Sequence, residues 1–333
     1  MTHVLIGVPA REEDKALWEA VPGCEFLYDE AFDAESLAWA DVIFGVVPAK
    51  KLALCRRLKW IQFPAAGVDY YCMRRGAALP AGVTLTNATG AFGQRIAEHA
   101  LAAVLGLYNN FPQYRDMQRA GGFENLGMPL SLHGSTVLMI GAGDIGTAFA
   151  RLTRPFGCRN IAVRRTKAPL GEPFDETYTL RELPALLPQA DAVLCALPAT
   201  RETQHVMGGE QFALMKRASV FVNVGRGSAV DTDALASALQ AGRPGAAALD
   251  VTDPEPLPAG HPLRQCPNVF ITPHIAGLGF GHRPEVTDYI TSLFTQNLRL
   301  FLAGKPLKNE VDMALGYTKK ASESAPVAGR RDV

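Results

Sequence analysis

The chain has 333 residues. A single hydrophobic core stops growing at roughly 250–300 residues, so we expect two domains. Hydrophobic residues make up 48% of the sequence and charged residues 20%, a composition too apolar for a disordered protein. Lys and Arg total 33, as do Asp and Glu. This balance disfavours the classes of protein that bind nucleic acid or membrane surfaces through a net positive field.

The start of the chain predicts a β-strand and not a signal peptide. A short polar tripeptide leads directly into the apolar residues 4–8, with no basic segment and no small-residue cleavage site. No apolar run approaches the roughly 20 residues that a membrane-spanning helix needs. Six cysteines are scattered without the spacing of zinc ligands. We therefore expect a cytoplasmic protein with no membrane partner and no bound metal.

Short apolar runs rich in β-forming residues alternate with helical patterns along the whole chain, which indicates an α/β fold with parallel sheets. In the first part, strands are predicted at residues 4–8, 42–47, 60–63 and 83–86. Residues 12–20 suit a helix, so this part resembles a small doubly wound domain. After Gly90, apolar residues recur at helical spacing, and this predicted helix can carry the chain between domains.

A second series of strands follows. It is predicted at residues 136–140, 160–163, 192–196, 220–223, 246–251 and 269–272. Six strands with intervening helices make a complete dinucleotide-binding sheet. Residues 285–303 then predict another long helix, whose length suggests a return to the first domain. Residues 319–333 contain almost no large apolar side chains, so we expect a flexible tail.

The clearest motif is a glycine-rich turn between a predicted strand and a predicted helix. It reads GxGxxG, with glycines at Gly141, Gly143 and Gly146 around Asp144 and Ile145. The first glycine permits a tight turn, the second lets a pyrophosphate approach the backbone, and the third lets helix and strand pack closely. The alternative is a glycine-rich turn without a ligand, but its position between strand and helix favours nucleotide binding.

The cofactor choice rests on the end of the next strand. Enzymes of this fold that use NAD carry an acidic residue about 20 positions on, which binds the ribose hydroxyl. Here the sequence has Arg164, Arg165 and Thr166. A guanidinium binds a 2′-phosphate through charge-assisted hydrogen bonds, whereas a carboxylate repels it. We therefore predict NADPH (NADP+), with NADH accepted less well. The alternative is that these arginines form a solvated strand end.

Three further residues follow predicted strands and can reduce a keto group together. Arg226 lies just after residues 220–223, and its fork of donors can bind a carboxylate and polarise a carbonyl. His274 lies just after residues 269–272 and is our candidate proton donor. Glu255 can hydrogen-bond its other ring nitrogen and favour the imidazolium form. Singly, Arg226 can be a salt-bridge residue and Glu255 a solvated carboxylate. By contrast, His99 lies within an apolar helix and reads as a structural histidine.

With these motifs in place, the chain resembles the D-isomer-specific 2-hydroxyacid dehydrogenases, including their NADPH-using glyoxylate and hydroxypyruvate reductases, over about residues 67–307. The family's catalytic set matches Arg226 in NVGRG, Glu255 in LDVTDPEPLP and His274 in PHIAG. The resemblance implies reduction of a 2-keto acid to a D-2-hydroxy acid. It also implies that backbone amides of Ala66 and Gly67 bind the substrate carboxylate.

The resemblance also implies a cofactor site and an arrangement of domains. Asp250 resembles the residue that orients the nicotinamide carboxamide, and Asp144 and Ile145 would meet the pyrophosphate. The remaining cofactor residues are Leu197, Pro198, Thr203, Val224, Gly225 and Gly277. A Rossmann domain of residues 96–284 would be inserted in a flavodoxin-like substrate domain of residues 1–95 and 285–318. A homodimer is the usual state of the family.

Two other functions stay open at this stage. Transcriptional corepressors with this fold keep similar motifs, so the chain can instead be a dinucleotide-sensing binding protein. Formate dehydrogenases resemble it overall, but they pair their histidine with a glutamine, and Glu255 argues against that activity. Substrate size is also open: Tyr70, Tyr71 and Phe92 suit a bulky keto acid, or they belong to the core.

Overall fold

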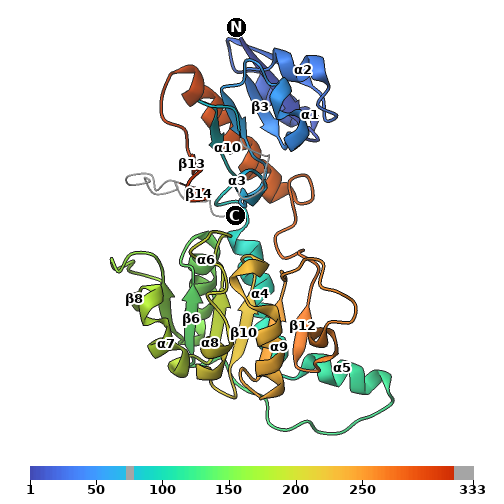
Figure 1. The fold of residues 1–333 in the computed structure, drawn as a ribbon, viewed down its shortest axis with the longest axis vertical. Coiled ribbons are helices and arrows are strands. Elements are labelled where there is room, and N and C mark those ends of the chain that lie inside the picture. Colours follow the sequence, from blue (N-terminus) through green and yellow to red (C-terminus); the bar gives the residue numbers. More distant parts are fainter. Residues whose placement is uncertain (73–78, 319–333) are drawn as a thin grey trace. The chain divides into compact units, whose positions relative to one another are not determined.

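The computed structural model describes residues 1–72 and 79–318. The chain forms two compact units, shown in Figure 1. The first unit combines Met1–Ala91 with the chain from Gly279 onward, and the second unit is Phe92–Leu278. The predicted flexible tail, residues 319–333, lies outside the described residues. Each unit is described below by itself.

The first unit is built on a five-stranded parallel sheet in the order β2-β1-β3-β4-β5. The strands are β1 (Thr2–Gly7), β2 (Cys24–Tyr28), β3 (Val42–Gly45), β4 (Trp60–Gln62) and β5 (Thr84–Thr86). This order is that of flavodoxin-like folds. Four strands match the sequence prediction. The fifth, β2, was missed because it is an edge strand whose alternate residues are exposed and whose apolar run is only three residues long.

The helices of the first unit pack on this sheet through aromatic side chains. They are α1 (Glu12–Glu19), α2 (Ala34–Trp39), α3 (Asp69–Cys72) and α10 (Pro284–Leu302), with a 3-10 helix at Ala49–Leu54 and a small hairpin of β13 (Val311–Asp312) and β14 (Tyr317–Thr318). Phe294 of α10 stacks 4.6 Å from Phe44 and 5.5 Å from Trp60, ring centre to ring centre. Residues from both ends of the chain therefore share one core.

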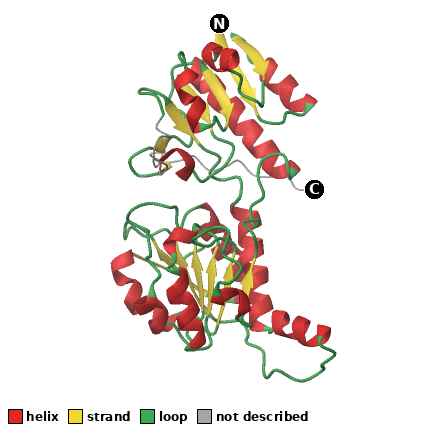
Figure 2. Ribbon diagram, turned by 45° about the vertical axis from the view of Figure 1, so that its right-hand side comes forward, coloured by secondary structure: helices red, strands yellow, loops and turns green. Residues whose placement is uncertain are grey.

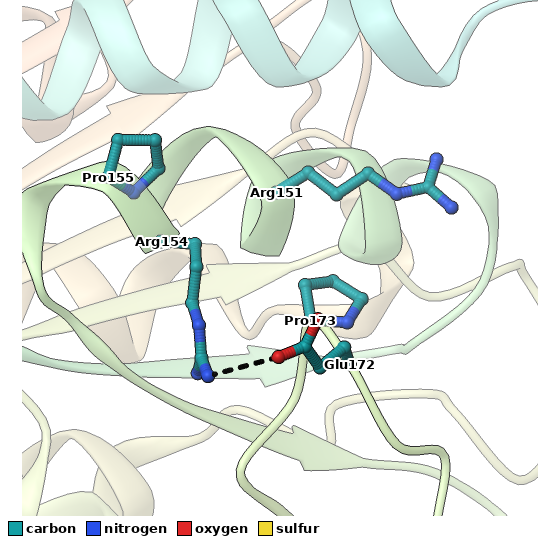
Figure 3. A pocket seen from close by; sticks show the side chains of 5 residues that line it. All are labelled: Arg151, Arg154, Pro155, Glu172 and Pro173. Atoms are coloured by element: carbon teal, nitrogen blue, oxygen red, sulfur yellow. Dashed lines mark ion pairs between the residues drawn. The ribbon is translucent and has the colours of Figure 1, made fainter.

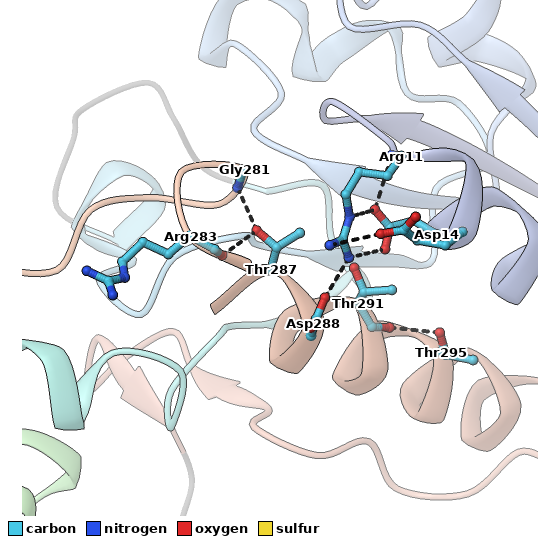
Figure 4. Close-up of polar contacts among 9 residues, drawn as sticks. Arg11, Asp14, Gly281, Arg283, Thr287, Asp288, Thr291 and Thr295 are labelled. Atoms are coloured by element: carbon cyan, nitrogen blue, oxygen red, sulfur yellow. Dashed lines mark hydrogen bonds and ion pairs between the residues drawn. The ribbon is translucent and has the colours of Figure 1, made fainter. Parts of the chain in front are cut away.

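A charged cluster fixes the start of α1 against α10 (Figure 4). The Arg11 guanidinium donates two hydrogen bonds of 2.8 Å to the carboxylate of Asp14 and one of 2.7 Å to Asp288. Asp14 is buried. Burial raises the pKa of this carboxyl, but the hydrogen bonds and positive charge of Arg11 outweigh burial and hold the pKa below its ordinary value.

We expect Asp14→Ala to lower the free energy of unfolding by about 2 kcal/mol at pH 7, because it removes both guanidinium bonds from a buried position. The loss should shrink as pH falls through the depressed folded-state pKa of Asp14, since protonation removes the same interaction in the wild type. Urea unfolding at pH 7 and pH 3 measures this. The control Glu12→Ala removes an exposed carboxylate and should cost less than about 0.5 kcal/mol. An equal Asp14→Ala loss at both pH values would contradict the account.

The second unit contains a seven-stranded parallel sheet in the order β12-β11-β10-β9-β6-β7-β8. The strands are β6 (Thr136–Ile140), β7 (Arg159–Val163), β8 (Glu176–Tyr178), β9 (Ala192–Cys195), β10 (Val220–Asn223), β11 (Ala246–Leu249) and β12 (Val269–Ile271). Taken from β8, the order corresponds to the Rossmann sequence 3-2-1-4-5-6 with one further strand. The expectation of six strands was one short, because β8 is a three-residue edge strand with no apolar run.

Helices lie on both sides of this sheet (Figure 2). The helices of the second unit are α4 (Gly93–Tyr108), α5 (Phe111–Arg119), α6 (Asp144–Thr153), α7 (Leu183–Leu186), α8 (Gly209–Leu214) and α9 (Thr232–Gln240), of which α5 extends away from the sheet. There are 3-10 turns at Arg154–Phe156, Leu180–Glu182, Leu187–Gln189, Gly227–Ala229 and Pro262–Gln265. Two separate apolar clusters fill the two faces. In the described part of the chain, no helix is both long and apolar enough to cross a membrane. The predicted fold class, α/β with two doubly wound domains, is confirmed.

Candidate active site

The glycine-rich turn joins the middle of the second unit's sheet to a helix. Strand β6 ends at Ile140, and α6 starts at Asp144 with Gly143 as its N-cap. Gly141 has φ +105°, and a Cβ there would lie 2.6 Å from the carbonyl oxygen of Ala196, so only glycine fits. A Cβ on Gly146 would collide with the backbone of Gly141, whereas nothing lies within 4 Å of one on Gly143. The turn therefore combines close packing with open space at its middle glycine.

This turn fits the pyrophosphate of a dinucleotide. The first turn of α6 presents backbone N–H groups and the positive end of the helix dipole. The carboxylate of Asp144 accepts a hydrogen bond of 2.9 Å from the N–H of Gly93, the first residue of α4. That bond directs the acidic side chain to another helix start, which reduces its repulsion toward a bound phosphate. Asp144 and Ile145 would thus offer their backbone.

The arginine cluster lies at the end of the strand next to β6. Arg164 follows β7 directly, and its N–H donates to the carbonyl oxygen of Tyr178 at 2.9 Å, which continues the β7–β8 pairing. Arg165 and Thr166 are exposed. The next residue, Lys167, pairs with Glu182. Residues 164–170 include no carboxylate. The cluster therefore occupies the strand end at which Rossmann folds bind the adenosine ribose, and residues 164–167 carry three positive charges there.

Arg226 lies in a turn that a buried asparagine holds. The side chain of Asn223, the last residue of β10, donates to the carbonyl oxygen of Arg226 at 3.1 Å and accepts from the N–H of Gly225 at 3.2 Å. A Cβ on Gly225 would lie 2.6 Å from backbone atoms of Leu197. The turn is therefore tightly packed on the loop after β9. Asn223 was missed in the sequence because it looked like the polar end of a strand.

The structure brings Glu255 and His274 together. The Nδ1 atom of His274 lies 2.6 Å from the Oε1 atom of Glu255, and the other carboxylate oxygen accepts from the N–H of Thr252 at 3.3 Å. Both side chains are close to half exposed, at 48% for His274 and 41% for Glu255. The other ring nitrogen of His274, Nε2, is the one that faces away from the carboxylate. This geometry is that of a histidine oriented by an acidic partner.

Asp250 follows β11 and anchors the loop that carries His274. Its Oδ1 accepts hydrogen bonds from Oγ1 of Thr272 at 2.6 Å and from the N–H of Ile275 at 2.9 Å. Its Oδ2 accepts from the N–H of Ala276 at 3.0 Å. Among the described residues, this is the one hydrogen bond of Oδ2, so Oδ2 can also accept a hydrogen bond from a carboxamide. The expected role of Asp250 toward the nicotinamide stays a prediction. Thr272 was missed in the sequence.

The remaining predicted residues lie where the strands end, with different surroundings. The Thr203 hydroxyl donates to the carbonyl oxygen of Pro198 at 2.6 Å, so it closes the loop after β9. Gly277 packs near Ile96 of α4. In the first unit, the loop after β4 contains Ala66 and Gly67, and the side chain of Asn87 donates to the carbonyl oxygen of Ala66 at 2.6 Å. Their roles toward cofactor and substrate stay predictions.

A hollow of about 500 Å³ on the second unit is not part of this site (Figure 3). It is lined by Arg151, Arg154, Pro155, Glu172 and Pro173. These residues precede β7 and β8, so they lie at the amino ends of the strands, opposite the phosphate turn. Arg154 pairs with Asp175 at 2.6 Å and with Glu172 at 3.6 Å. Its charge is therefore already balanced by protein carboxylates.

The geometry defines a class: a dinucleotide-dependent oxidoreductase with a histidine, an acid and an arginine at the carboxyl edge of a Rossmann sheet. A family model for the "D-isomer specific 2-hydroxyacid dehydrogenase, NAD binding domain" matches residues 101–276, more than half of the chain. The chain belongs to this family of NAD(P)-dependent 2-hydroxyacid reductases, as its sequence predicted.

Relatives and solved structures agree with this assignment. A glyoxylate reductase of Aeropyrum pernix is 30% identical over 310 residues, which is 90% of each chain. A crystal structure of a family protein from Aeromonas salmonicida subsp. salmonicida has a TM-score of 0.81 at 31% identity, covering 94% of this chain and 99% of that one. A family structure from Xanthobacter autotrophicus, in complex with NADPH and MES, has a TM-score of 0.78 at 29% identity and covers 95% and 99%.

Proposed function

We propose that the protein reduces a 2-keto acid to the D-2-hydroxy acid with NADPH, and that Arg226, Glu255 and His274 carry the reaction. The observation that carries this proposal is the 2.6 Å pair of His274 Nδ1 and Glu255 Oε1 at the carboxyl edge of the Rossmann sheet. The cofactor, when bound, supplies the hydride for the carbonyl carbon. The protein must then bind the acid, polarise its carbonyl and deliver a proton to the oxygen.

The proton is delivered by His274. Its Nδ1 is held by Glu255, so Nε2 is the atom that donates to the carbonyl oxygen. The carboxylate of Glu255 accepts from Nδ1–H and holds the ring in one orientation before transfer. After transfer, the neutral ring keeps its Nδ1–H bonded to the carboxylate, so the same orientation is ready for reprotonation. The pair thus assigns one nitrogen to orientation and the other to chemistry.

We assign substrate binding in the second unit to Arg226. Arg226 follows β10 and has its backbone fixed by Asn223. Its Nη1 atom donates to the carbonyl oxygen of Gly225 at 3.0 Å, so the guanidinium lies over its own turn. Its planar fork can bind one carboxylate oxygen and the keto oxygen of a 2-keto acid together, which a lysine cannot reproduce.

The preference for NADPH is supported by charge. Arg164 and Arg165 replace the acidic residue that binds a ribose hydroxyl, and Thr166 adds a hydroxyl donor. Structural relatives from Xanthobacter autotrophicus and Sinorhizobium meliloti are in complex with NADPH and with NADP, respectively. The Sinorhizobium meliloti protein is described as an NADPH-dependent glyoxylate/hydroxypyruvate reductase. Small 2-keto acids of this kind are the first substrates to test.

A panel of 2-keto acids with NADPH tests the proposed function. We expect NADPH oxidation that depends on the keto acid, with formate giving no reduction of NADP+ because Glu255 takes the place of the glutamine of formate dehydrogenases. Tight NADPH binding with no turnover on any keto acid would instead support a dinucleotide-sensing protein.

We also propose a homodimer formed through an arm of the second unit, residues 111–131. Figure 1 shows α5 and the loop that follows it extending away from the sheet of their unit. No residue of α5 is buried, and the arm exposes Phe111, Phe123 and Met128 by 61%, 102% and 90%. An exposed apolar arm of this kind is typical of a subunit contact. A second copy of this chain is the occupant that a homodimeric family implies.

Charging the arm tests the homodimer. We expect Phe123→Glu with Met128→Glu to shift the protein from dimer to monomer in light scattering, because burying two carboxylates in an apolar contact is costly. The control Leu17→Glu changes a 40% exposed leucine on α1 and should leave the dimer intact. A monomeric wild type would contradict the proposal, as would a dimer unaffected by the arm variant.

A further inference from the structure

The loop that carries His274 is held by a single buried residue. The backbone carbonyl of Asp250 accepts from the N–H of His274 at 2.8 Å, and its carboxylate accepts from the N–H groups of Ile275 and Ala276 at 2.9 and 3.0 Å. Three consecutive amides of the loop therefore end on one residue. The position of the His274 backbone therefore depends on the position of Asp250.

This restraint is needed because the loop is locally strained. His274 has φ +54°, in the left-handed region that a side chain other than glycine occupies at a cost of roughly 1–2 kcal/mol. Its two neighbours on the C-terminal side are bonded to the Asp250 carboxylate, and its own N–H is bonded to the Asp250 carbonyl. The conformation that directs the imidazole is thus stabilised by Asp250.

Asp250 is itself held by the side chain of Thr272, which in turn contacts His99. Oγ1 of Thr272, just after β12, lies 2.6 Å from the Asp250 carboxylate and 3.2 Å from Nε2 of His99 in α4. An ionised carboxylate only accepts, so the single hydroxyl proton of Thr272 points to Asp250. The hydroxyl oxygen then accepts from His99, which must carry a proton on Nε2. Burial of His99 lowers its pKa despite the nearby Asp250 charge, which favours a neutral ring with that single tautomer.

We propose that His99 and Thr272 are positioning residues that orient the Asp250 carboxylate, and through it both the His274 loop and the nicotinamide carboxamide. This inference rests on the proposed function for its kinetic consequences. The direction of donation is fixed from His99 through Thr272 to Oδ1 of Asp250, so Oδ2 keeps an acceptor position for the carboxamide. His99, which the sequence suggested was a structural histidine, thereby acquires a function.

Removing the Thr272 hydroxyl tests the hydrogen bonds from His99 through Thr272 to Asp250 at their middle member. We expect Thr272→Val, which keeps the shape, to lower kcat/KM for the keto acid about ten- to hundredfold, the effect of losing a hydrogen bond to a charged group. The dissociation constant of NADPH, measured by fluorescence titration without substrate, should rise as well. Thr272→Ser restores the hydroxyl and should restore both values to within about threefold. A Thr272→Val enzyme with wild-type kinetics and NADPH affinity would overturn the proposal.

The tautomer of His99 gives a test that needs no turnover. In the wild type at pH 7, nitrogen NMR should show His99 protonated at Nε2 and not at Nδ1. The losses of kcat/KM caused by His99→Leu and by Thr272→Val should also be less than additive in the double variant, because both substitutions interrupt the same series of hydrogen bonds. The opposite tautomer or full additivity would contradict the inference. A wild type that turns over no keto acid would contradict the proposed function instead, while the tautomer and the NADPH affinities would still decide the inference.

Discussion

Replacing His274 with alanine lowers kcat for keto-acid reduction by about 10²- to 10⁴-fold, the usual contribution of a positioned general acid. The dissociation constant of NADPH should stay within about threefold of the wild type, because the phosphate turn and the arginine cluster lie on other loops of the unit. Steady-state kinetics and fluorescence titration measure the two quantities. The reason is geometric. Glu255 contacts Nδ1, the opposite nitrogen of the ring, so it cannot replace Nε2 as the proton donor.

Two matched variants define the origin of that loss. His133→Ala removes an exposed histidine before β6 and should leave kcat unchanged. Glu255→Gln keeps a hydrogen-bonding side chain beside His274 but replaces the carboxylate that accepts from Nδ1–H with a weaker neutral acceptor, so kcat should fall by an intermediate factor of about ten. If His274→Ala kept near wild-type kcat, His274 would not be the proton donor.

Replacing Arg164 and Arg165 together with alanine should lower kcat/KM for NADPH by about 10²-fold or more, because two charge-assisted contacts to the 2′-phosphate are lost. The value for NADH should change little, since NADH has no phosphate at that position. The wild type should therefore prefer NADPH, and the double variant should lose most of that preference. Added salt should reduce the preference of the wild type for NADPH over NADH, because it screens the attraction between the arginines and the 2′-phosphate.

Arg154→Ala is the matched control for the cofactor prediction. Arg154 is also a surface arginine of the second unit, but at the amino ends of the strands it pairs with Asp175 and, as Figure 3 shows, with Glu172. Its loss should not change the ratio of NADPH to NADH kinetics. A wild type with equal kcat/KM for the two cofactors, or with a preference for NADH, would rule out the arginine cluster as a phosphate site.

The sequence predicted the central strands of both sheets and one edge strand of each, β5 and β12, but it missed the opposite edges. Central strands such as β10 are covered on both faces, so they read as continuous apolar runs. The missed edge strands, β2 and β8, have partly exposed residues, including Glu25 and Glu176, and apolar runs of three residues or fewer. Their pairing with β1 and β7 depends on tertiary contacts that local patterns do not contain.

For the candidate site, position at a strand end was the informative signal. Arg226 and His274 each follow a predicted strand, and the carboxyl ends of parallel strands meet at one edge. The supporting contacts were not predictable, because they join distant parts of the chain. Thr272 meets His99 across 173 positions, and Asp144 meets Gly93 across 51. Only the folded sheet and helices bring these polar groups within hydrogen-bonding distance.

The central claim is tested most directly by the products of the wild-type enzyme with NADPH and a prochiral keto acid such as hydroxypyruvate or phenylpyruvate. Chiral chromatography of the product, together with absorbance of the cofactor, gives both stereochemistry and stoichiometry. The account predicts one D-2-hydroxy acid formed for each NADPH oxidised, with NADH a poorer donor. Formation of the L-isomer, or no cofactor oxidation with any 2-keto acid, would contradict it.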